Sequence, residues 1–396
     1  MQKEPAPKSF HLLFLSIVLV LTSAAQPYEK LHRKAIVADT HNDILETCLD
    51  KGYSFDQALK GKTHSDIQRF KEGGVDVQVF SVWCDGKQKD PFNFANRMID
   101  TLYATIARNP DKIALVNNSK ELKKAVHDKK LAAMIGVEGG HMMEADLGKL
   151  DSLYKRGTRY MTLTWNNSTS WATSAMEETI DSLRHQPKGM NDFGKQVVQR
   201  MNQLGMMVDL SHVGEQTFWD AMAATTKPVL ISHSCVYNIC PVFRNLKDDQ
   251  IKAIGKNNGV IQLNFFSGFL DSSFEKKSNA FQANHKAERD SLLKLNPDKN
   301  AATKYINTKY AAEREAMRPP LSLLLDHLDY VVNMIGADHV GLGGDFDGVG
   351  STAQQLDDVT TYPIITKALL ERGYSKKQTR KILGGNFLRV LKANEN

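Results

Sequence analysis

The sequence of 396 residues carries a formal net charge of +6 at pH 7, from 51 Lys and Arg residues against 45 Asp and Glu residues. This excess is modest and scattered, with no basic stripe and no interleaved aromatic and basic residues, so we expect no nucleic-acid partner. The cysteines lack C-x-x-C spacing, which leaves a zinc ribbon or a thioredoxin-type site unsupported. The sequence does not determine whether they pair; they are Cys48, Cys84, Cys235 and Cys240.

The N-terminal segment has the order of a secretory signal peptide. Two lysines precede an apolar run at residues 10–21, and small residues follow at 22–25. The run is shorter than the roughly 20 apolar residues of a transmembrane helix, and the C-terminus lacks the apolar tail of a GPI anchor. We predict a signal peptide over residues 1–25 and a mature domain, 26–396, that is secreted or periplasmic without a membrane anchor.

Buried-strand patterns alternate with helical patterns along the mature domain, which is typical of βα units and a parallel sheet. One helical segment, 94–108, has apolar residues at helical spacing. Eight strands are predicted, enough to close a (β/α)8 TIM-type barrel. They cover residues 35–39, 75–82, 132–137, 160–164, 206–210, 228–232, 259–264 and 339–343.

One stretch interrupts this alternation after the seventh predicted strand. Residues 270–318 are rich in Lys, Glu, Asp, Asn and Ala, with few large apolar residues, and end at Pro319-Pro320. The composition predicts a charged helical insertion. A solvated excursion and a lid or subunit contact are both compatible with it, because long loops on the C-terminal face of a barrel often have such roles.

Metal-ligand types recur where the predicted strands end. His41 and Asp43 are two residues apart, so on an extended strand their side chains project to the same side. Other strands end at Glu138, His212, His233 and Asp345, and all of these ends lie on the face of a barrel that carries active sites. Nitrogen and carboxylate ligands without thiolates suit zinc, and a carboxylate can bridge two ions.

Eight short motifs occur in one order along the chain: His41-Asn42-Asp43, His64-Ser65-Asp66, the run 136–141, Ser211-His212-Val213, Ser232-His233-Ser234, Arg244-Asn245, the run 344–348 and the run 384–389. Together they resemble the membrane dipeptidase, or renal dipeptidase, family of zinc metallopeptidases. The resemblance extends from about residue 34 to residue 391, with the insertion excepted.

The resemblance implies two Zn²⁺ ions per chain. His41 and Asp43 would hold one ion, His212 and His233 the other, and Glu138 would bridge them. Water shared by the two ions would then attack the peptide bond of a dipeptide as a bridging hydroxide.

The resemblance also implies roles for two further residues. Asp345 would be the acid/base carboxylate, with nearby Asp347 as the alternative. Arg244 would bind the free carboxylate of the substrate, a task that suits a planar guanidinium. His141 is not counted as a ligand and would cap or orient Glu138.

The chain departs from the family pattern after the fourth strand. Many members carry a histidine there that is thought to stabilise the tetrahedral intermediate, whereas this chain has Trp165 and Asn166. We expect either side chain to face the substrate as a hydrogen-bond donor.

Two alternatives to an exported dipeptidase stay open. The first is a non-catalytic barrel that binds metal, and the second is an amidohydrolase that acts on N-acyl amino acids. A complete set of expected ligands together with Asp345 favours an enzyme. A homodimer is compatible with the sequence, which does not determine the oligomeric state.

Overall fold

The computed structural model describes residues 27–180 and 187–396, so the predicted signal peptide lies outside the described residues. Eight parallel strands pair in chain order around a barrel, and a ninth, β3, pairs with β4 outside this path. They are β1 (Ala38–Asn42), β2 (Val77–Trp83), β3 (Ile113–Leu115), β4 (Leu131–Glu138), β5 (Thr158–Thr162), β6 (Met207–Asp209), β7 (Leu230–Ile231), β8 (Val260–Leu263) and β9 (Val340–Leu342).

Two backbone hydrogen bonds join the first and last strands and close the barrel. The amide of Asp43 donates to the carbonyl of Phe346 at 3.0 Å, and the amide of Asp345 donates to the carbonyl of His41 at 3.1 Å. The predicted (β/α)8 barrel is therefore confirmed. All eight predicted strands overlap an observed one, but the first runs further than expected, through His41 to Asn42.

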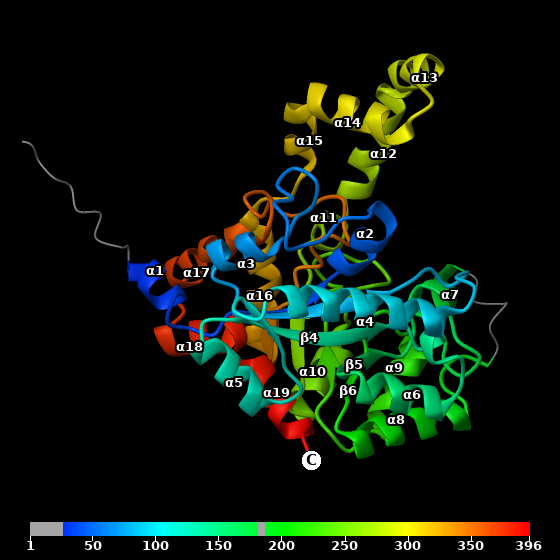
Figure 1. The fold of residues 1–396 in the computed structure, drawn as a ribbon, viewed down its shortest axis with the longest axis vertical. Helices are drawn as coiled ribbons and strands as arrows, with labels where there is room; N and C mark the ends of the chain where they lie inside the picture. The colour runs from blue at the N-terminus through cyan, green and yellow to red at the C-terminus, as the bar shows by residue number, and fades with distance from the viewer. Residues whose placement is uncertain (1–26, 181–186) are drawn as a thin grey trace, which may run out of the picture.

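Helices fill the connections between strands (Figure 1). Before β5 they are α1 (Pro27–His32), α2 (Ile44–Lys51), α3 (Ile67–Gly73), α4 (Pro91–Arg108), α5 (Ser119–His127), η1 (Gly140–Met143) and α6 (Leu147–Lys155). Between β5 and β8 they are α7 (Ala175–Ile180), α8 (Asp192–Leu204), α9 (Glu215–Ala224) and α10 (Asp248–Lys256). After β8 they are α11 (Ser267–Leu270), α12 (Phe274–Asn284), α13 (Lys286–Leu295), α14 (Lys299–Lys309), α15 (Ala311–Met317), α16 (Leu321–Ile335), η2 (Val359–Thr361), α17 (Tyr362–Glu371), α18 (Lys376–Arg380), η3 (Lys381–Gly385) and α19 (Asn386–Asn394).

The barrel strands are buried on both faces, as expected for a parallel sheet that is covered by helices. All eight residues of β4 are buried, and helix α4 covers the barrel with an apolar face that includes Met98 and Leu102. Proline at the first position of α4 starts that helix without losing a hydrogen bond. The barrel therefore offers a rigid frame for side chains at its strand ends.

Helices α12 to α15 form an arm that projects from the barrel (Figure 1). The arm occupies most of the predicted insertion, and it is helical as expected. Aromatic stacking holds it together, since the rings of His285 and Tyr310 lie 3.6 Å apart between centroids and Phe281 packs against both. At its tip Leu295 is 86% exposed.

The four cysteines, whose pairing the sequence left undetermined, are buried and make no disulfide. Within the described residues, no helix combines the length and the apolar character needed to cross a membrane.

Candidate metal centre

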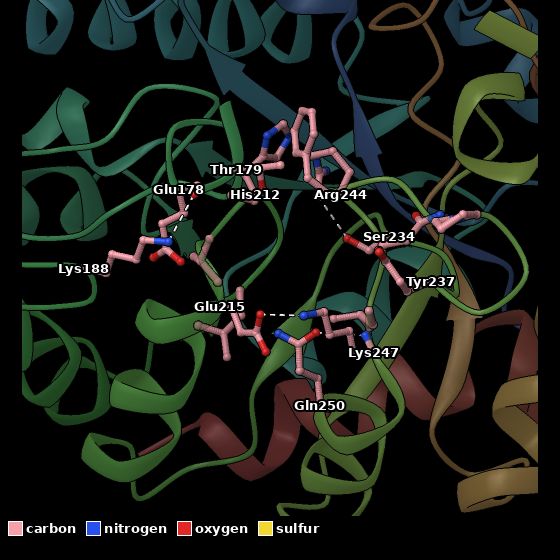
Figure 2. A pocket seen from close by; sticks show the side chains of 17 residues that line it. Glu178, Thr179, Lys188, His212, Glu215, Ser234, Tyr237, Arg244, Lys247 and Gln250 are labelled. Atoms are coloured by element: carbon pink, nitrogen blue, oxygen red, sulfur yellow. Dashed lines mark hydrogen bonds and ion pairs between the residues drawn. The ribbon is translucent and has the colours of Figure 1, made fainter. Parts of the chain in front are cut away.

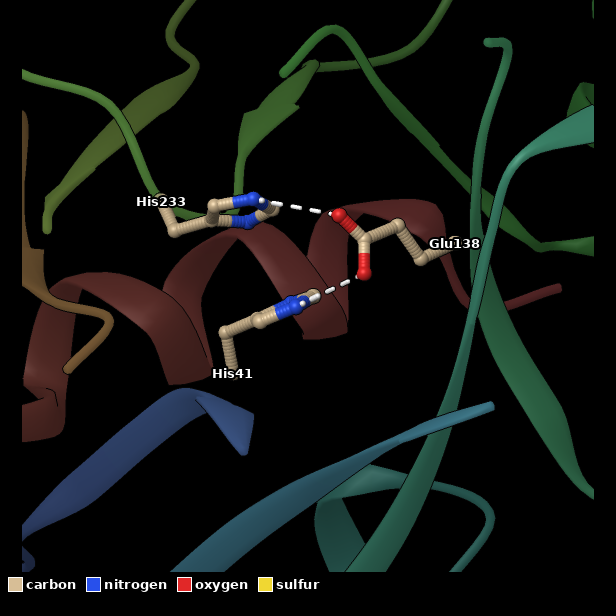
Figure 3. Close-up of side chains that lie close together, drawn as sticks. All are labelled: His41, Glu138 and His233. Atoms are coloured by element: carbon tan, nitrogen blue, oxygen red, sulfur yellow. Dashed lines mark hydrogen bonds and ion pairs between the residues drawn. The ribbon is translucent and has the colours of Figure 1, made fainter. Parts of the chain in front are cut away.

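A single carboxylate lies at the centre of the expected ligands (Figure 3). Glu138, the last residue of β4, directs Oε2 toward Nε2 of His41 at 3.1 Å and Oε1 toward Nε2 of His233 at 3.4 Å. Nε2 of His212 is 2.9 Å from the same Oε1, and Nε2 of His41 is 3.5 Å from Oδ2 of Asp43. The two oxygens of Glu138 thus face different ligand sets, which is the arrangement that a bridging carboxylate requires.

Two compact groups of ligand atoms result. One contains His41, Glu138 and His233, and the other contains His41, Asp43 and Asp345. His212 adjoins the first group, because its Nε2 lies 3.0 Å from Nε2 of His233. The structure therefore brings together all five residues that the resemblance implied as ligands.

In each of the three histidines, Nδ1 is hydrogen-bonded to a protein group and Nε2 is directed toward Glu138. For His41 this group is the hydroxyl of Tyr160, at 2.9 Å. That hydroxyl donates its only proton to the carbonyl of Thr40 at 3.0 Å, so it must accept from Nδ1–H. Nε2 of His41 then offers the lone pair that a metal needs once its own proton is lost.

The group at Nδ1 of His212 is an amide that the sequence analysis expected near the substrate. Oδ1 of Asn166 accepts from Nδ1 of His212 at 3.0 Å, so this amide orients a ligand. Asn166 and Trp165 both line the ligand cavity, and donation from either one to the substrate stays a prediction. For His233 the group at Nδ1 is the hydroxyl of Ser232, at 2.8 Å. All three rings are therefore held at Nδ1 by a group that can accept a hydrogen bond, with Nε2 directed toward the position of a metal.

The charges of the buried groups around these ligands favour the binding of a cation. Burial opposes a positive charge on His41, but Glu138 and Asp43 outweigh it and raise the pKa of His41 to about 10. Burial lowers the pKa of His212 to about 4 and holds the pKa of His233 well below its usual value, so both are neutral ligands. Burial, reinforced by Glu138 and Asp345, raises the pKa of Asp43 well above its ordinary value.

Among the described residues the buried acids have no lysine or arginine in direct contact, and Arg244 acts on Glu138 and Asp345 without an ion pair. No ion pair with either residue type reaches Asp43, Glu138 or Asp345 within the ranges that the structure describes, and Oδ1 of Asp43 has no hydrogen-bond partner. Removing a carboxylate from water without a counter-charge is costly. A nitrogen and carboxylate donor set with a deficit of positive charge fits divalent zinc.

The backbone near these ligands has strained φ angles at some residues and approaches the ligand side chains closely at others. His212, Asp345 and Asp347 have positive φ angles of 63°, 58° and 69°, which few non-glycine residues adopt. A Cβ on Gly348 would lie 2.2 Å from Oδ2 of Asp43 and 2.5 Å from Oδ1 of Asp345. Glycine at position 348 therefore lets the chain after β9 approach the ligands.

The two candidate acid/base residues have different surroundings. Oδ2 of Asp345 accepts from the amide of Asn264 at 2.7 Å, and its side chain lies in the second ligand group. The carboxylate of Asp347 instead accepts from the backbone amide of His64 at 2.6 Å and from the hydroxyl of Ser65. Asp347 thus anchors the loop before α3, and the geometry favours Asp345.

Arg244 is a buried cation that forms no ion pair with any residue that the structure describes. It is 5% exposed; Nη2 donates to the carbonyl of His233 at 3.2 Å and Nη1 to the hydroxyl of Ser234 at 3.3 Å, while Nε has no hydrogen-bond partner in this part of the chain. Burial lowers the pKa of Arg244 to about 10 although Glu138 opposes the change. The guanidinium is therefore placed and charged to receive an anion.

Two cavities meet at this centre. One, of about 350 Å³, is lined by ligands, by Asp345 and by aromatic side chains that include Trp83 and Trp165. The other, of about 320 Å³, is lined by Arg244, and His212 lines both (Figure 2). A small molecule can thus lie near the ligands and reach toward Arg244.

The aromatic wall contains one residue that the sequence analysis missed. Trp83 ends β2 and packs edge-on against Trp165, with ring centroids 5.0 Å apart. Nε1 of Trp83 is buried and makes no hydrogen bond with any described residue. The sequence signal that could have identified Trp83 is its position at the end of a strand, like that of Glu138.

His141 does not orient Glu138 as expected. Its Nε2 lies 3.1 Å from the carbonyl of Cys84, and Nδ1 has no hydrogen-bond partner among the residues of the described ranges. The ring packs over Gly139, where a Cβ would lie 2.4 Å from Cε1. The side chain therefore shapes the turn after β4.

Tyr160→Phe should weaken metal binding by about 10 to 100-fold, the usual worth of a group that orients a ligand. The ring would still fill the space over Gly136, where a Cβ would lie 2.0 Å from Cζ of Tyr160, but Nδ1 of His41 would lose its acceptor. Competition with a chelator measures the affinity. Tyr374→Phe, remote from the ligands, is the matched control, and equal affinities for the two variants would contradict this role.

The comparisons with known proteins agree with this geometry. The model of the membrane dipeptidase family, peptidase family M19, matches residues 25–396. Dipeptidase 3 of Mus musculus is 30% identical over 372 residues, and Dipeptidase 3 of Rattus norvegicus is 31% identical over the same length. Each alignment covers 91% of this chain but only 65% and 66% of the relative, so the chain spans just under two thirds of these curated relatives.

Solved structures with the same fold include the dipeptidase AC, a metallopeptidase of family M19, with a TM-score of 0.74 and 23% identity over 91% of this chain and 98% of that one. The probable dipeptidase PvdM of Pseudomonas aeruginosa gives 0.75 and 24% over 93% and 97%. A metallopeptidase of Rhodobacter sphaeroides, bound to a phosphinate mimic of the dipeptide L-Ala-D-Ala, gives 0.74 and 23% over 91% and 100%. Since the family model spans nearly the whole chain, this protein belongs to the membrane dipeptidase family, peptidase family M19.

Proposed function

We propose that this protein is a di-zinc dipeptidase that hydrolyses dipeptides with a free C-terminal carboxylate. The observation that carries the proposal is the Glu138 carboxylate, whose two oxygens face separate ligand sets beside the unpaired cation of Arg244. The peptide-mimic complex of the Rhodobacter sphaeroides relative, which has the same fold, supports a dipeptide as substrate.

His41, Asp43 and Glu138 would hold one ion, and His212, His233 and Glu138 the other. When bound, the zinc ions would act as a Lewis acid on the peptide carbonyl and would lower the pKa of bound water to near neutrality. This chain supplies the rest of the chemistry. Asp345 accepts the proton of the attacking water and delivers it to the departing amine, while Asn264 fixes one carboxylate oxygen at 2.7 Å.

Arg244 orients the substrate by its carboxylate. In the described structure, Nε of Arg244 has no partner and the two Nη hydrogen bonds are long. The guanidinium can replace these two bonds with a bidentate pair to the substrate carboxylate. That pair is stronger because both groups are charged. Trp83 and Trp165 line the ligand cavity. Arg244 is hydrogen-bonded to the carbonyl of His233, so a substrate whose carboxylate it binds has its scissile bond close to that carboxylate, as in a short peptide.

A dipeptide panel with L and D residues, assayed with and without a chelator, tests this function. We expect hydrolysis that the chelator abolishes and zinc restores, and metal analysis should give close to two zinc ions per chain. Amidation of the C-terminus should raise KM, because Arg244 loses its partner. Cleavage of N-acetyl amino acids in place of dipeptides would favour the amidohydrolase alternative, and binding without turnover would favour a non-catalytic barrel.

Asp345→Asn should lower kcat by about 100-fold or more, the typical worth of a positioned proton-transfer group. Zinc content and KM should change little, since the amide keeps the shape of the carboxylate and the loss occurs in the transition state. Steady-state kinetics with metal analysis measures all three. Asp347→Asn is the comparison, and a larger loss of kcat in that variant would transfer the acid/base role to Asp347.

Export is part of the proposal. The apolar run and Ser23-Ala24-Ala25 precede the mature domain, and the family model begins to match at residue 25. We expect the exported protein to begin at Gln26. Intact-mass measurement checks this, and a mass that retains residues 1–25 would refute it.

A further inference from the structure

Asp209 is a buried carboxylate that lies near the candidate ligands without bonding to a ligand side chain in the described part of the chain. Asp209, the last residue of β6, is 0% exposed. Its Oδ1 accepts from the backbone amides of Ser211 at 3.1 Å and Ser232 at 2.8 Å. Its Oδ2 accepts from the hydroxyls of Thr162 at 2.5 Å and Ser232 at 2.6 Å. Four donors match the acceptor capacity of an ionised carboxylate.

Ser232 connects this carboxylate to a ligand. Its hydroxyl has one proton and three polar neighbours, which are Oδ2 of Asp209 at 2.6 Å, Nδ1 of His233 at 2.8 Å and the hydroxyl of Ser211 at 3.2 Å. A charged carboxylate is the strongest acceptor and the nearest. The proton of Ser232 therefore goes to Asp209, and Nδ1 of His233 has to be the donor to Ser232.

The direction of this chain of hydrogen bonds decides what His233 can do. With the proton on Nδ1, Nε2 carries a lone pair toward Oε1 of Glu138, 3.4 Å away, and can ligate. If the hydrogen bonds ran in the opposite direction, Nε2 of His233 would carry the proton and could not ligate a metal. The groups at Nδ1 of His41 and His212 are a tyrosine hydroxyl and a neutral amide, so His233 is the ligand whose tautomer depends on a carboxylate.

We propose that Asp209 acts through Ser232 as a positioning residue that fixes His233 as a ligand and thereby retains metal at the position shared with His212. The inference rests on the metal use in the proposed function. It concerns one of the two positions, because neither Asp209 nor Ser232 is hydrogen-bonded to His41 or Asp43 in the described part of the chain.

Ser232→Ala separates this role from the contacts that join the strands. The variant removes the hydroxyl between Asp209 and His233 and leaves both backbone bonds to Oδ1. Thr162→Val is the matched control, since it removes the other hydroxyl from the same Oδ2; Thr162 pairs with Glu138 through the backbone ladder, which the variant keeps, and the lost hydroxyl bonds to Asp209. Ser232→Thr restores a hydroxyl and serves as the rescue.

Each purified full-length variant is dialysed against a graded series of chelator concentrations and its zinc content is measured, with the melting temperature as the check on folding. Ser232→Ala should lose one zinc at a chelator concentration about 10 to 100-fold lower than the wild type. Thr162→Val and Ser232→Thr should retain both ions. Equal losses in Ser232→Ala and Thr162→Val, or no loss in Ser232→Ala, would overturn the inference.

A second measurement does not depend on the variants. In ¹⁵N spectra of the metal-free wild type, the ring of His233 should carry its proton on Nδ1, and the Ser232→Thr spectrum should keep this signal. A proton on Nε2 would overturn the inference. A wild type that binds no metal but shows the expected tautomer would instead contradict the proposed function and leave the hydrogen-bond chain intact.

Discussion

The buried negative charge of Glu138 is the constraint on which the other features of the centre depend. Its carboxylate is 4% exposed, no lysine or arginine pairs with it in the described residues, and it lies between three imidazole rings. His41 alone compensates it with a proton when no cation is present, while burial keeps His212 and His233 neutral. Divalent cations would relieve this imbalance better than a proton can, since the two proposed positions together use all three rings.

Two further buried aspartates hold the strand ends that carry the ligands. Asp209 joins β6 to β7, and Asp39 accepts from the backbone amides of His41 at 2.9 Å and Gly344 at 3.0 Å and from the hydroxyl of Tyr362. Burial raises the pKa of Asp39 to about 6 despite these donors. Asp39 thus fixes β1 against the segment that carries Asp345, at the seam where the barrel closes. The same bonds therefore serve the fold and the site.

The arm differs from the barrel in how it is stabilised. Its helices α13 and α15 bury no residue, and it is held by ring stacking and exposed ion pairs such as Lys309 with Glu288. Such pairs contribute little individually. At its base the arm borders a cavity of about 560 Å³ that shares Phe266 and Gly350 with the lining of the ligand cavity. The arm is thus adjacent to the centre without supplying an expected ligand.

The order of apolar runs and the ligand types at their ends determined the barrel and the identity of the candidate ligands, because strand ends of a parallel barrel meet on one face. Sequence could not assign Asn166 or Tyr160, since their hydrogen bonds to Nδ1 join side chains from different strands that only the closed barrel brings within 3.0 Å. Ser232 adjoins His233 in the sequence, but only the fold places Asp209 beside its hydroxyl. It also missed β3, whose three residues are too few to show a period and lie outside the barrel. The family resemblance already favoured Asp345 over Asp347, and tertiary contacts supply the physical difference: both follow β9, and only the fold places His64 and Ser65 against Asp347 and Asn264 against Asp345.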